Sequence, residues 1–291
     1  MPTISAIFAG ILATALLSGA ASAACDPPAV VVPVVVPVAV PVAVPPAVPA
    51  ARTESYPDDP RLDIALQMLK KGSGDAAIMT ARAVIKSRPD VDRAVAILGI
   101  ALDKQKKYED ARVQLEKARD SKQAFPERKH VPHFLGWCCF HLGDLAAART
   151  AFEAHLKLVP DEPDSTFGLA LVALGEDKLD EADALFAKAL KGFSEPTPRA
   201  VDQARVLTRM ADLALRRDEV NKAEELLERA IKASALQHET WSKLARVRDR
   251  LGKPAEADAA RANAQRILEA LGRTQPDAAK PAPQAPAGDT Q

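Results

Sequence analysis

The sequence predicts an all-α fold, a solenoid of stacked helical hairpins, on three observations. A 34-residue period runs through most of the 291-residue chain. Glycine and aromatic residues are scarce, at 13 residues and 4%, as is usual for helical arrays. No segment shows the apolar and polar alternation of a strand. Alanine holds position 20 in every copy of the period: Ala77, Ala111, Ala148, Ala182, Ala223 and Ala257.

The period divides the chain into six copies, each long enough for two short helices. Position 8 is small and position 7 is aliphatic in every copy. We therefore expect the two helices to cross closely, with position 8 facing the alanine at position 20. The copies span residues 58–91, 92–125, 129–162, 163–196, 204–237 and 238–271. Position 8 holds Ala65, Gly99, Gly136, Ala170, Ala211 and Ala245, and position 7 holds Ile64, Leu98, Leu135, Leu169, Met210 and Leu244.

Turn residues separate the two helices in four of the copies. They are Gly72-Ser73-Gly74-Asp75, Gly143-Asp144, Gly175-Glu176-Asp177 and Gly252-Lys253-Pro254. Pro254 would begin a helix, where its missing N–H removes no hydrogen bond. The predicted order is therefore helix, turn, helix in each copy.

The repeated residues resemble those of the tetratricopeptide repeat family, which has Trp, Leu, Gly and Tyr on its first helix and Ala, Phe and Pro on its second. The matches are Leu135, Gly136, Ala148, Phe152 and Pro160 in the third copy, Ala182, Phe186 and Ala189 in the fourth, and Trp241, Leu244 and Ala257 in the sixth. Other residues replace the tyrosine in all six copies, and the closing proline occurs only at Pro89 and Pro160. The resemblance implies a right-handed superhelix whose concave groove binds a partner.

The family also implies which first-helix positions line that groove, and in this chain they divide into two halves. One half is apolar and aromatic, with Ile100, His133, Trp137, Phe140, His141, Phe167 and Leu171. The other is mainly basic, with Arg205, Arg209, Arg216, Lys243, Arg246 and Arg250, relieved by Asp212, Glu239 and Asp249. We expect a protein or peptide segment that is apolar with an acidic end. A second interpretation packs Trp137 and Phe140 between helices and leaves the arginines as a solvated face.

Residues 1–24 are predicted to be a secretory signal peptide, since an apolar run from Ile4 to Leu17 precedes a series of small residues. An uncleaved anchor is the alternative, but the run is short for a span of about 20 residues. Cleavage after Ala24 leaves Cys25 first, the residue that bacterial lipoproteins lipidate. Those proteins usually carry Leu where this chain has Ser22, so an ordinary cleaved signal remains an alternative to lipidation.

Proline-rich segments flank the repeats. Residues 25–57 carry Pro33, Pro37, Pro41 and Pro45 at four-residue intervals, which predicts an extended, semi-rigid spacer. Residues 272–291 contain further prolines without apolar periodicity, and this tail is predicted to be disordered.

The charge balance and the absence of motifs exclude several functions. With 39 basic and 39 acidic residues, the chain lacks the basic excess of a nucleic-acid-binding protein. No catalytic or phosphate-binding motif is present, so we expect no enzymatic activity and no cofactor. His130, His133, Cys138 and His141 share one predicted helix, but they do not face one direction, so no metal site is expected. Membrane contact is expected only through a lipid at Cys25.

The sequence as a whole predicts an exported bacterial scaffold of the cell envelope, periplasmic or associated with the outer membrane. Two alternatives remain at this point. One is a lipoprotein similar to the pilotins that help to assemble pilus secretin channels. The other is a non-catalytic subunit of an envelope enzyme complex.

Overall fold

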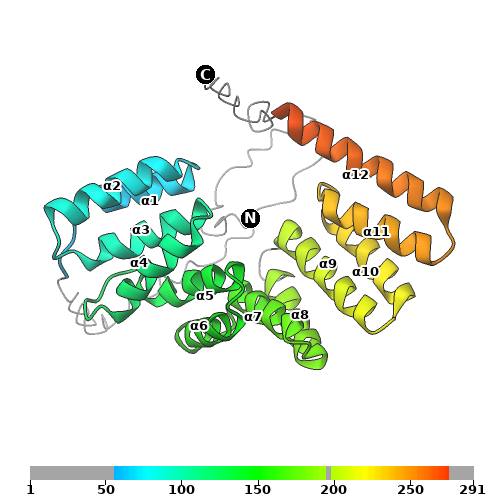
Figure 1. Cartoon of the computed structure of the whole chain (residues 1–291), viewed down its shortest axis with the longest axis horizontal. Coiled ribbons are helices and arrows are strands. Elements are labelled where there is room, and N and C mark those ends of the chain that lie inside the picture. Colours follow the sequence, from blue (N-terminus) through cyan, green and yellow to red (C-terminus); the bar gives the residue numbers. More distant parts are fainter. Residues whose placement is uncertain (1–55, 195–197, 275–291) are drawn as a thin grey trace, which may run out of the picture. The chain divides into compact units, whose positions relative to one another are not determined.

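The computed structural model describes residues 56–194 and 198–274 (Figure 1). In these ranges it contains twelve α-helices, one short 3-10 helix and no strand, which confirms the all-α prediction. The α-helices are α1 (Arg61–Lys70), α2 (Gly74–Ser87), α3 (Asp92–Lys104), α4 (Tyr108–Asp120), α5 (Val131–His141), α6 (Leu145–Leu158), α7 (Pro163–Gly175), α8 (Leu179–Ser194), α9 (Ala200–Arg216), α10 (Val220–Ala233), α11 (His238–Arg250) and α12 (Pro254–Thr274); η1 (Arg128–His130) precedes α5.

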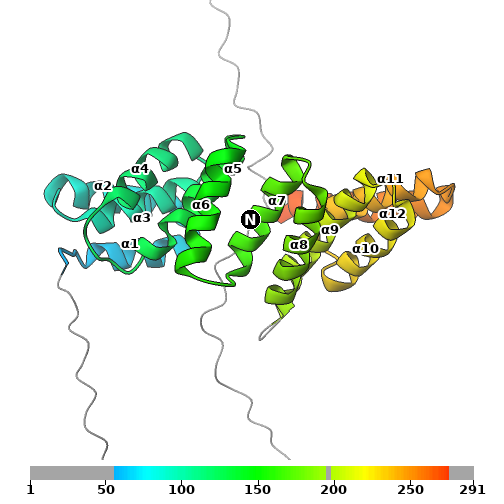
Figure 2. The same cartoon turned by 90° about the horizontal axis from the view of Figure 1, so that it is seen from below.

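Each helix packs against the next one along the chain, as Figures 1 and 2 both show. The first helix of a hairpin also contacts the first helix of the following hairpin, in the pairs α1 and α3, α3 and α5, α5 and α7, and α7 and α9. Because every hairpin covers part of its neighbour, the predicted solenoid of helical hairpins is confirmed.

The helix bounds differ from the predicted repeat bounds at two places. Helix α9 begins at Ala200, inside the stretch of residues between the fourth and fifth copies. Arg199 precedes it and binds Asp202 in its first turn, with Nε and Oδ2 2.8 Å apart, so the helix starts early. Helix α12 continues to Thr274, three residues beyond the expected limit of 271. The predicted signal peptide, the spacer up to residue 55, Cys25 and the tail from 275 lie outside the described residues.

Three of the predicted turns place glycine in the left-handed region of backbone space. Gly72, Gly143 and Gly252 have φ values of 83°, 81° and 71°, which glycine adopts at no steric cost. In the fourth copy, Asp177 takes this role at φ 60°, while Gly175 is the last residue of α7. Aspartate tolerates this conformation better than most residues, so the turn forms at Asp177 rather than at the glycine.

The alanines at position 20 are all fully buried, as the repeat frame requires. In the second and third copies, the atoms nearest to a side chain at position 8 belong to position 24 rather than to the alanine at position 20. A Cβ added to Gly99 would lie 2.7 Å from Leu115 Cγ, and one added to Gly136 would lie 2.6 Å from the Phe152 ring. These partners stand one helical turn after the alanine, because helical side chains lean toward the N-terminus of their helix and cover the preceding turn.

Phe152 of α6 fills the junction between the third and fourth copies. Its ring is fully buried and lies against Gly136 of α5 and Gly168 of α7, both of which leave no room for a side chain. The two glycines are therefore needed for an aromatic ring to fit between three helices.

Among the helices of the described ranges, none combines the length and the apolar character that a membrane span requires.

Candidate functional site

Aromatic side chains of α5 form the most distinctive surface of the described chain. His141 is exposed and stacks on Tyr108 of α4, with ring centroids 4.4 Å apart and planes 18° apart. Trp137 meets Phe140 edge to face at 6.0 Å, and it also contacts the buried ring of Phe152 at 5.3 Å. We call this set, together with the partly buried Leu171 of α7, the aromatic surface: Tyr108, Trp137, Phe140, His141 and Leu171.

Trp137 carries an unsatisfied polar group within this surface. Its indole Nε1 is shielded from solvent and has no hydrogen-bond acceptor among the described residues. Trp241, the second tryptophan of the chain, donates its Nε1 hydrogen to the carbonyl of Ala235 at 2.8 Å. Because a buried N–H without an acceptor costs free energy, a side-chain rearrangement that brings this donor against a partner's acceptor would recover that cost.

Two of the predicted groove residues are core residues instead. Ile100 is 5% exposed and Phe167 is 2% exposed, so neither side chain offers contact area to a partner. The Arg205 guanidinium lies over the Phe167 ring, with Cζ 5.3 Å from the ring centroid, so the ring supports that side chain. Their groove assignment followed from position in the repeat, whereas burial depends on how tightly α3 and α7 pack on their neighbours.

The predicted basic half is largely neutralised by acidic residues within the array. Five of its six cations form ion pairs. On α9, Arg205 binds Asp202 at 3.3 Å, Arg209 binds Asp212 at 3.1 Å and Glu239 at 3.0 Å, and Arg216 binds Asp177 at 3.4 Å. On α11, Lys243 binds Asp212 and Glu239, and Arg250 binds Asp218 at 2.9 Å. Lys243 is also buried. Within the described ranges, Arg246 is the one cation of this set without an ion pair or hydrogen bond. The expectation of a mainly basic surface is therefore corrected to a surface of paired charges.

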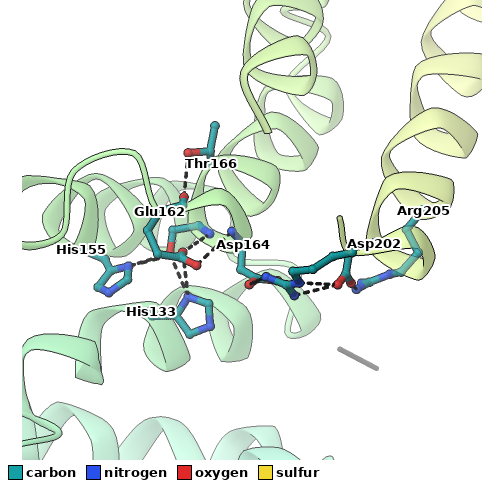
Figure 3. Close-up of polar contacts among 9 residues, drawn as sticks. His133, His155, Glu162, Asp164, Thr166, Asp202 and Arg205 are labelled. Atoms are coloured by element: carbon teal, nitrogen blue, oxygen red, sulfur yellow. Dashed lines mark hydrogen bonds and ion pairs between the residues drawn. The ribbon is translucent and has the colours of Figure 1, made fainter. Parts of the chain in front are cut away.

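A second cluster of polar side chains lies where α5, α6 and α7 meet (Figure 3). Nδ1 of His133 and Nδ1 of His155 lie 2.8 and 2.7 Å from the Ser165 hydroxyl. On its far side, Nε2 of His155 lies 3.2 Å from Nδ1 of His130. His155 is 1% exposed. Burial lowers the pKa of His133 to about 3 and that of His155 to about 4, so both imidazoles are neutral at pH 7.

Glu162 completes this cluster and also caps α7. Its carboxylate accepts the backbone N–H of Ser165 at 2.7 Å and that of Asp164 at 3.1 Å, and its carbonyl accepts the Thr166 hydroxyl at 2.8 Å. Burial and the charge of Asp164 raise the pKa of the carboxyl group. Figure 3 shows the carboxylate facing the two imidazoles.

Ion pairs extend from this cluster to α9. Asp164 binds Arg199 at 2.8 Å, Arg199 binds Asp202, and Asp202 reaches Arg205 beside the aromatic surface (Figure 3). This chain of charges links α7 with α9, and its members are partly or fully buried, so it is more than a solvated face.

The structure separates the four residues that share the predicted helix of the third copy. His130 and His133 join the polar cluster, His141 stacks on Tyr108, and Cys138 Sγ lies 3.4 Å from Asp103 Oδ1. Cys138 and Cys139 are free thiols, and burial raises the pKa of both. Sequence reasoning missed Tyr108 and His155, because both lie on second helices and the family's groove positions lie on first helices. A signal existed, since four of the five histidines fall between residues 130 and 155.

Stacked helical hairpins with a partly exposed aromatic surface define a helical-repeat scaffold. Residues 62–127 and 140–200 match the model of the tetratricopeptide repeat family. Such repeats generally mediate protein–protein interactions, and the fold is typically non-catalytic. None of the curated proteins compared with the chain is significantly similar to it in sequence.

Solved structures share the fold at low sequence identity. A chain of the APC/C hetero-tetramer Cut9-Hcn1 is 15% identical with a TM-score of 0.62; the match covers 71% of this chain but only 39% of that one. BtubC from P. vanneervenii is 18% identical with a TM-score of 0.53, over 78% of this chain and 98% of that one. Pseudomonas aeruginosa pilF is 18% identical with a TM-score of 0.53, over 75% and 91%. These likenesses establish the fold.

Proposed function

We propose that this protein is a non-enzymatic scaffold that binds an extended or helical segment of a partner protein across the aromatic surface. The observation that carries the proposal is the Trp137 indole N–H, which has no acceptor within the described residues and lies among partly exposed rings. Aromatic rings give large contact area at low entropic cost, and a partner carbonyl would satisfy the donor.

The partner's chemistry follows from what borders the aromatic surface. Leu171 and the ring faces of Phe140 and Tyr108 favour apolar side chains. Arg205 and Arg209 lie on the next first helix, α9, and each already has an acidic partner. An acidic end of the bound segment would bind there by exchanging with Asp202 or Asp212, so it contributes to specificity more than to affinity.

The binding test separates the indole donor from the aromatic ring. Photo-crosslinking from position 141 in cells identifies the partner segment, whose synthetic peptide is then titrated against purified protein. We expect Trp137→Phe, which keeps a ring and removes the N–H, to weaken peptide binding about tenfold, as one buried hydrogen bond implies. Trp241→Phe is the matched control and should bind like the wild type, because Trp241 already has its acceptor.

Two results would overturn the binding proposal. One is a yield of crosslinked partner from position 141 that is no higher than the yield from the exposed position His238 on α11. The other is equal peptide affinity for Trp137→Phe and Trp241→Phe. Helical circular dichroism of each variant verifies that the fold is retained.

The site of action is proposed from residues 1–57, which precede the described helices. The apolar run, the small residues before Cys25 and the proline-rich spacer support an exported scaffold, periplasmic or tethered to the outer membrane. We expect the protein in the envelope fraction, and palmitate labelling of the wild type but not of Cys25→Ala. Labelling of both would remove the lipid anchor, and a cytosolic protein would remove the envelope role altogether.

A further inference from the structure

Three side chains of metal-ligating types converge at the junction of α5, α6 and α7. His133 comes from α5, His155 from α6 and Glu162 from the residue that caps α7. One ligand atom from each lies within 4.8 Å of the other two. Nδ1 of each imidazole is 3.9 Å from Oε2 of Glu162, and Figure 3 shows the three groups facing one another.

We propose that His133, His155 and Glu162 bind a divalent transition-metal ion, with Zn²⁺ as the first candidate. Ligand bonds of about 2.0–2.1 Å place the donors of a tetrahedral zinc site roughly 3.3 Å apart. The 3.9 Å separations therefore close by about half an ångström on binding, a shift within the range of side-chain rotation. Two imidazole nitrogens and one carboxylate suit zinc better than calcium or magnesium, which prefer oxygen ligands.

Ser165 is the candidate for the fourth coordination position of the ion. Its hydroxyl lies between the two Nδ1 atoms, at 2.8 and 2.7 Å, so both imidazoles direct Nδ1 toward it. A hydroxyl has only one hydrogen, and without a metal it donates to one histidine while accepting from the other. With an ion bound, the same oxygen either completes the coordination or turns away and admits a water molecule.

The groups around the site hold the ligands in place, as outer partners do in established metal sites. Backbone N–H groups of Asp164 and Ser165 fix both carboxylate oxygens of Glu162. Nε2 of His155, the nitrogen that would not bind the metal, lies 3.2 Å from His130 Nδ1.

An independent observation is the charge of Glu162, which lacks a basic partner. Its side chain is 21% exposed, and within the described ranges its ion-pair partners are only the two neutral histidines. Asp164, two residues later, is paired with Arg199 at 2.8 Å. Two backbone N–H groups at the start of α7 stabilise this carboxylate, and a metal ion held by the two histidines would add the countercharge that no basic side chain supplies.

The experiment uses the untagged full-length chain, freed of metal, and titrates Zn²⁺ by calorimetry. We expect one equivalent to bind with a dissociation constant of about 1 µM or tighter. Glu162→Gln should weaken binding roughly 100-fold, while its amide oxygen still accepts the Ser165 N–H and preserves the cap. His238→Ala removes an exposed histidine of α11 and should bind like the wild type.

Cobalt provides a second readout that does not depend on a variant. Co²⁺ at this site should give the visible absorption of a tetrahedral nitrogen and oxygen site, without the charge-transfer band of a thiolate from any cysteine. If Glu162→Gln does not fold, His133→Gln replaces it as the weakened variant. The proposal is overturned if no saturable equivalent of Zn²⁺ binds, if Co²⁺ shows thiolate ligation, or if the folded ligand variant binds Zn²⁺ as tightly as His238→Ala.

Discussion

The third and fourth copies differ from the fifth and sixth in how neighbouring helices are joined. Around α5–α8 the helices meet through large buried rings and a polar cluster of histidine, serine and glutamate. Around α9–α12 the cores are alanine, leucine and valine, and charged pairs cross between helices at the surface. One repeat frame therefore supports two kinds of junction, and only the first leaves rings and a free donor for a partner.

Position 24 of the repeat shows the difference most directly. It holds Phe152 in the third copy and Phe186 in the fourth, both fully buried. The fifth copy has Leu227, also fully buried, and the sixth has Arg261, which is exposed and pairs with Asp249 and Asp258. Phe152 lies against the glycines Gly136 and Gly168, whereas the fourth copy combines Phe186 with Ala170 at position 8, so ring size alone does not decide which residue stands opposite.

The largest effect that tests this comparison is expected from shortening position 24. Phe152→Ala should destabilise the array by about 4 kcal/mol, and Leu227→Ala by about 3 kcal/mol, since a ring between two glycines leaves the larger cavity. Urea unfolding followed by circular dichroism measures both. If Phe152→Ala lowers the free energy of unfolding no more than Leu227→Ala does, the two junctions tolerate cavities equally.

A pH-dependent loss of stability is also expected at the junction with histidines. The pKa values of His133 and His155 fall to about 3 and about 4 in the folded protein, from 6.5. Below pH 6.5 the unfolded chain takes up protons that the folded chain does not. Stability is therefore complete above pH 6.5 and is lost as pH falls, by up to about 1.4 kcal/mol per pH unit for each histidine.

The control for this pH effect must account for Asp103, whose pKa burial raises to about 6. This carboxyl group acts in the opposite direction, because the folded chain binds its proton more readily as pH falls below 6. The measurement is therefore the difference in melting temperature between the metal-free wild type and His133→Gln/His155→Gln at pH 7.5, 6 and 5. A difference that does not change with pH would mean that the imidazoles titrate normally in the folded protein.

The sequence was sufficient for the fold because its signals are local and repeated. Alanine at position 20 and small residues at position 8 recur with the period, and close packing of two helices depends on little else. The partner of position 8 was not predictable, since it depends on the lean of side chains along the second helix, as Gly136 and Phe152 show.

The candidate site was predicted only in part, because its properties depend on residues from other helices. Trp137, Phe140 and His141 were predicted from the groove positions that the family resemblance implies, but Tyr108 completes their surface from α4. The pairing of Arg205 with Asp202 and of Arg250 with Asp218 involves acidic residues outside the predicted groove positions. Likewise, the separation of 10 residues between His155 and Ser165 gives no periodic signal for their contact.

The position of the Phe152 ring has a practical consequence for dividing the chain. Repeat arrays are usually shortened at the loop between two hairpins, and residue 162 marks such a loop here. A fragment ending there would lose α7, and the loss of Gly168 would uncover one face of Phe152 while His155 lost its Ser165 partner. Fragments for expression should therefore keep α5–α8 together.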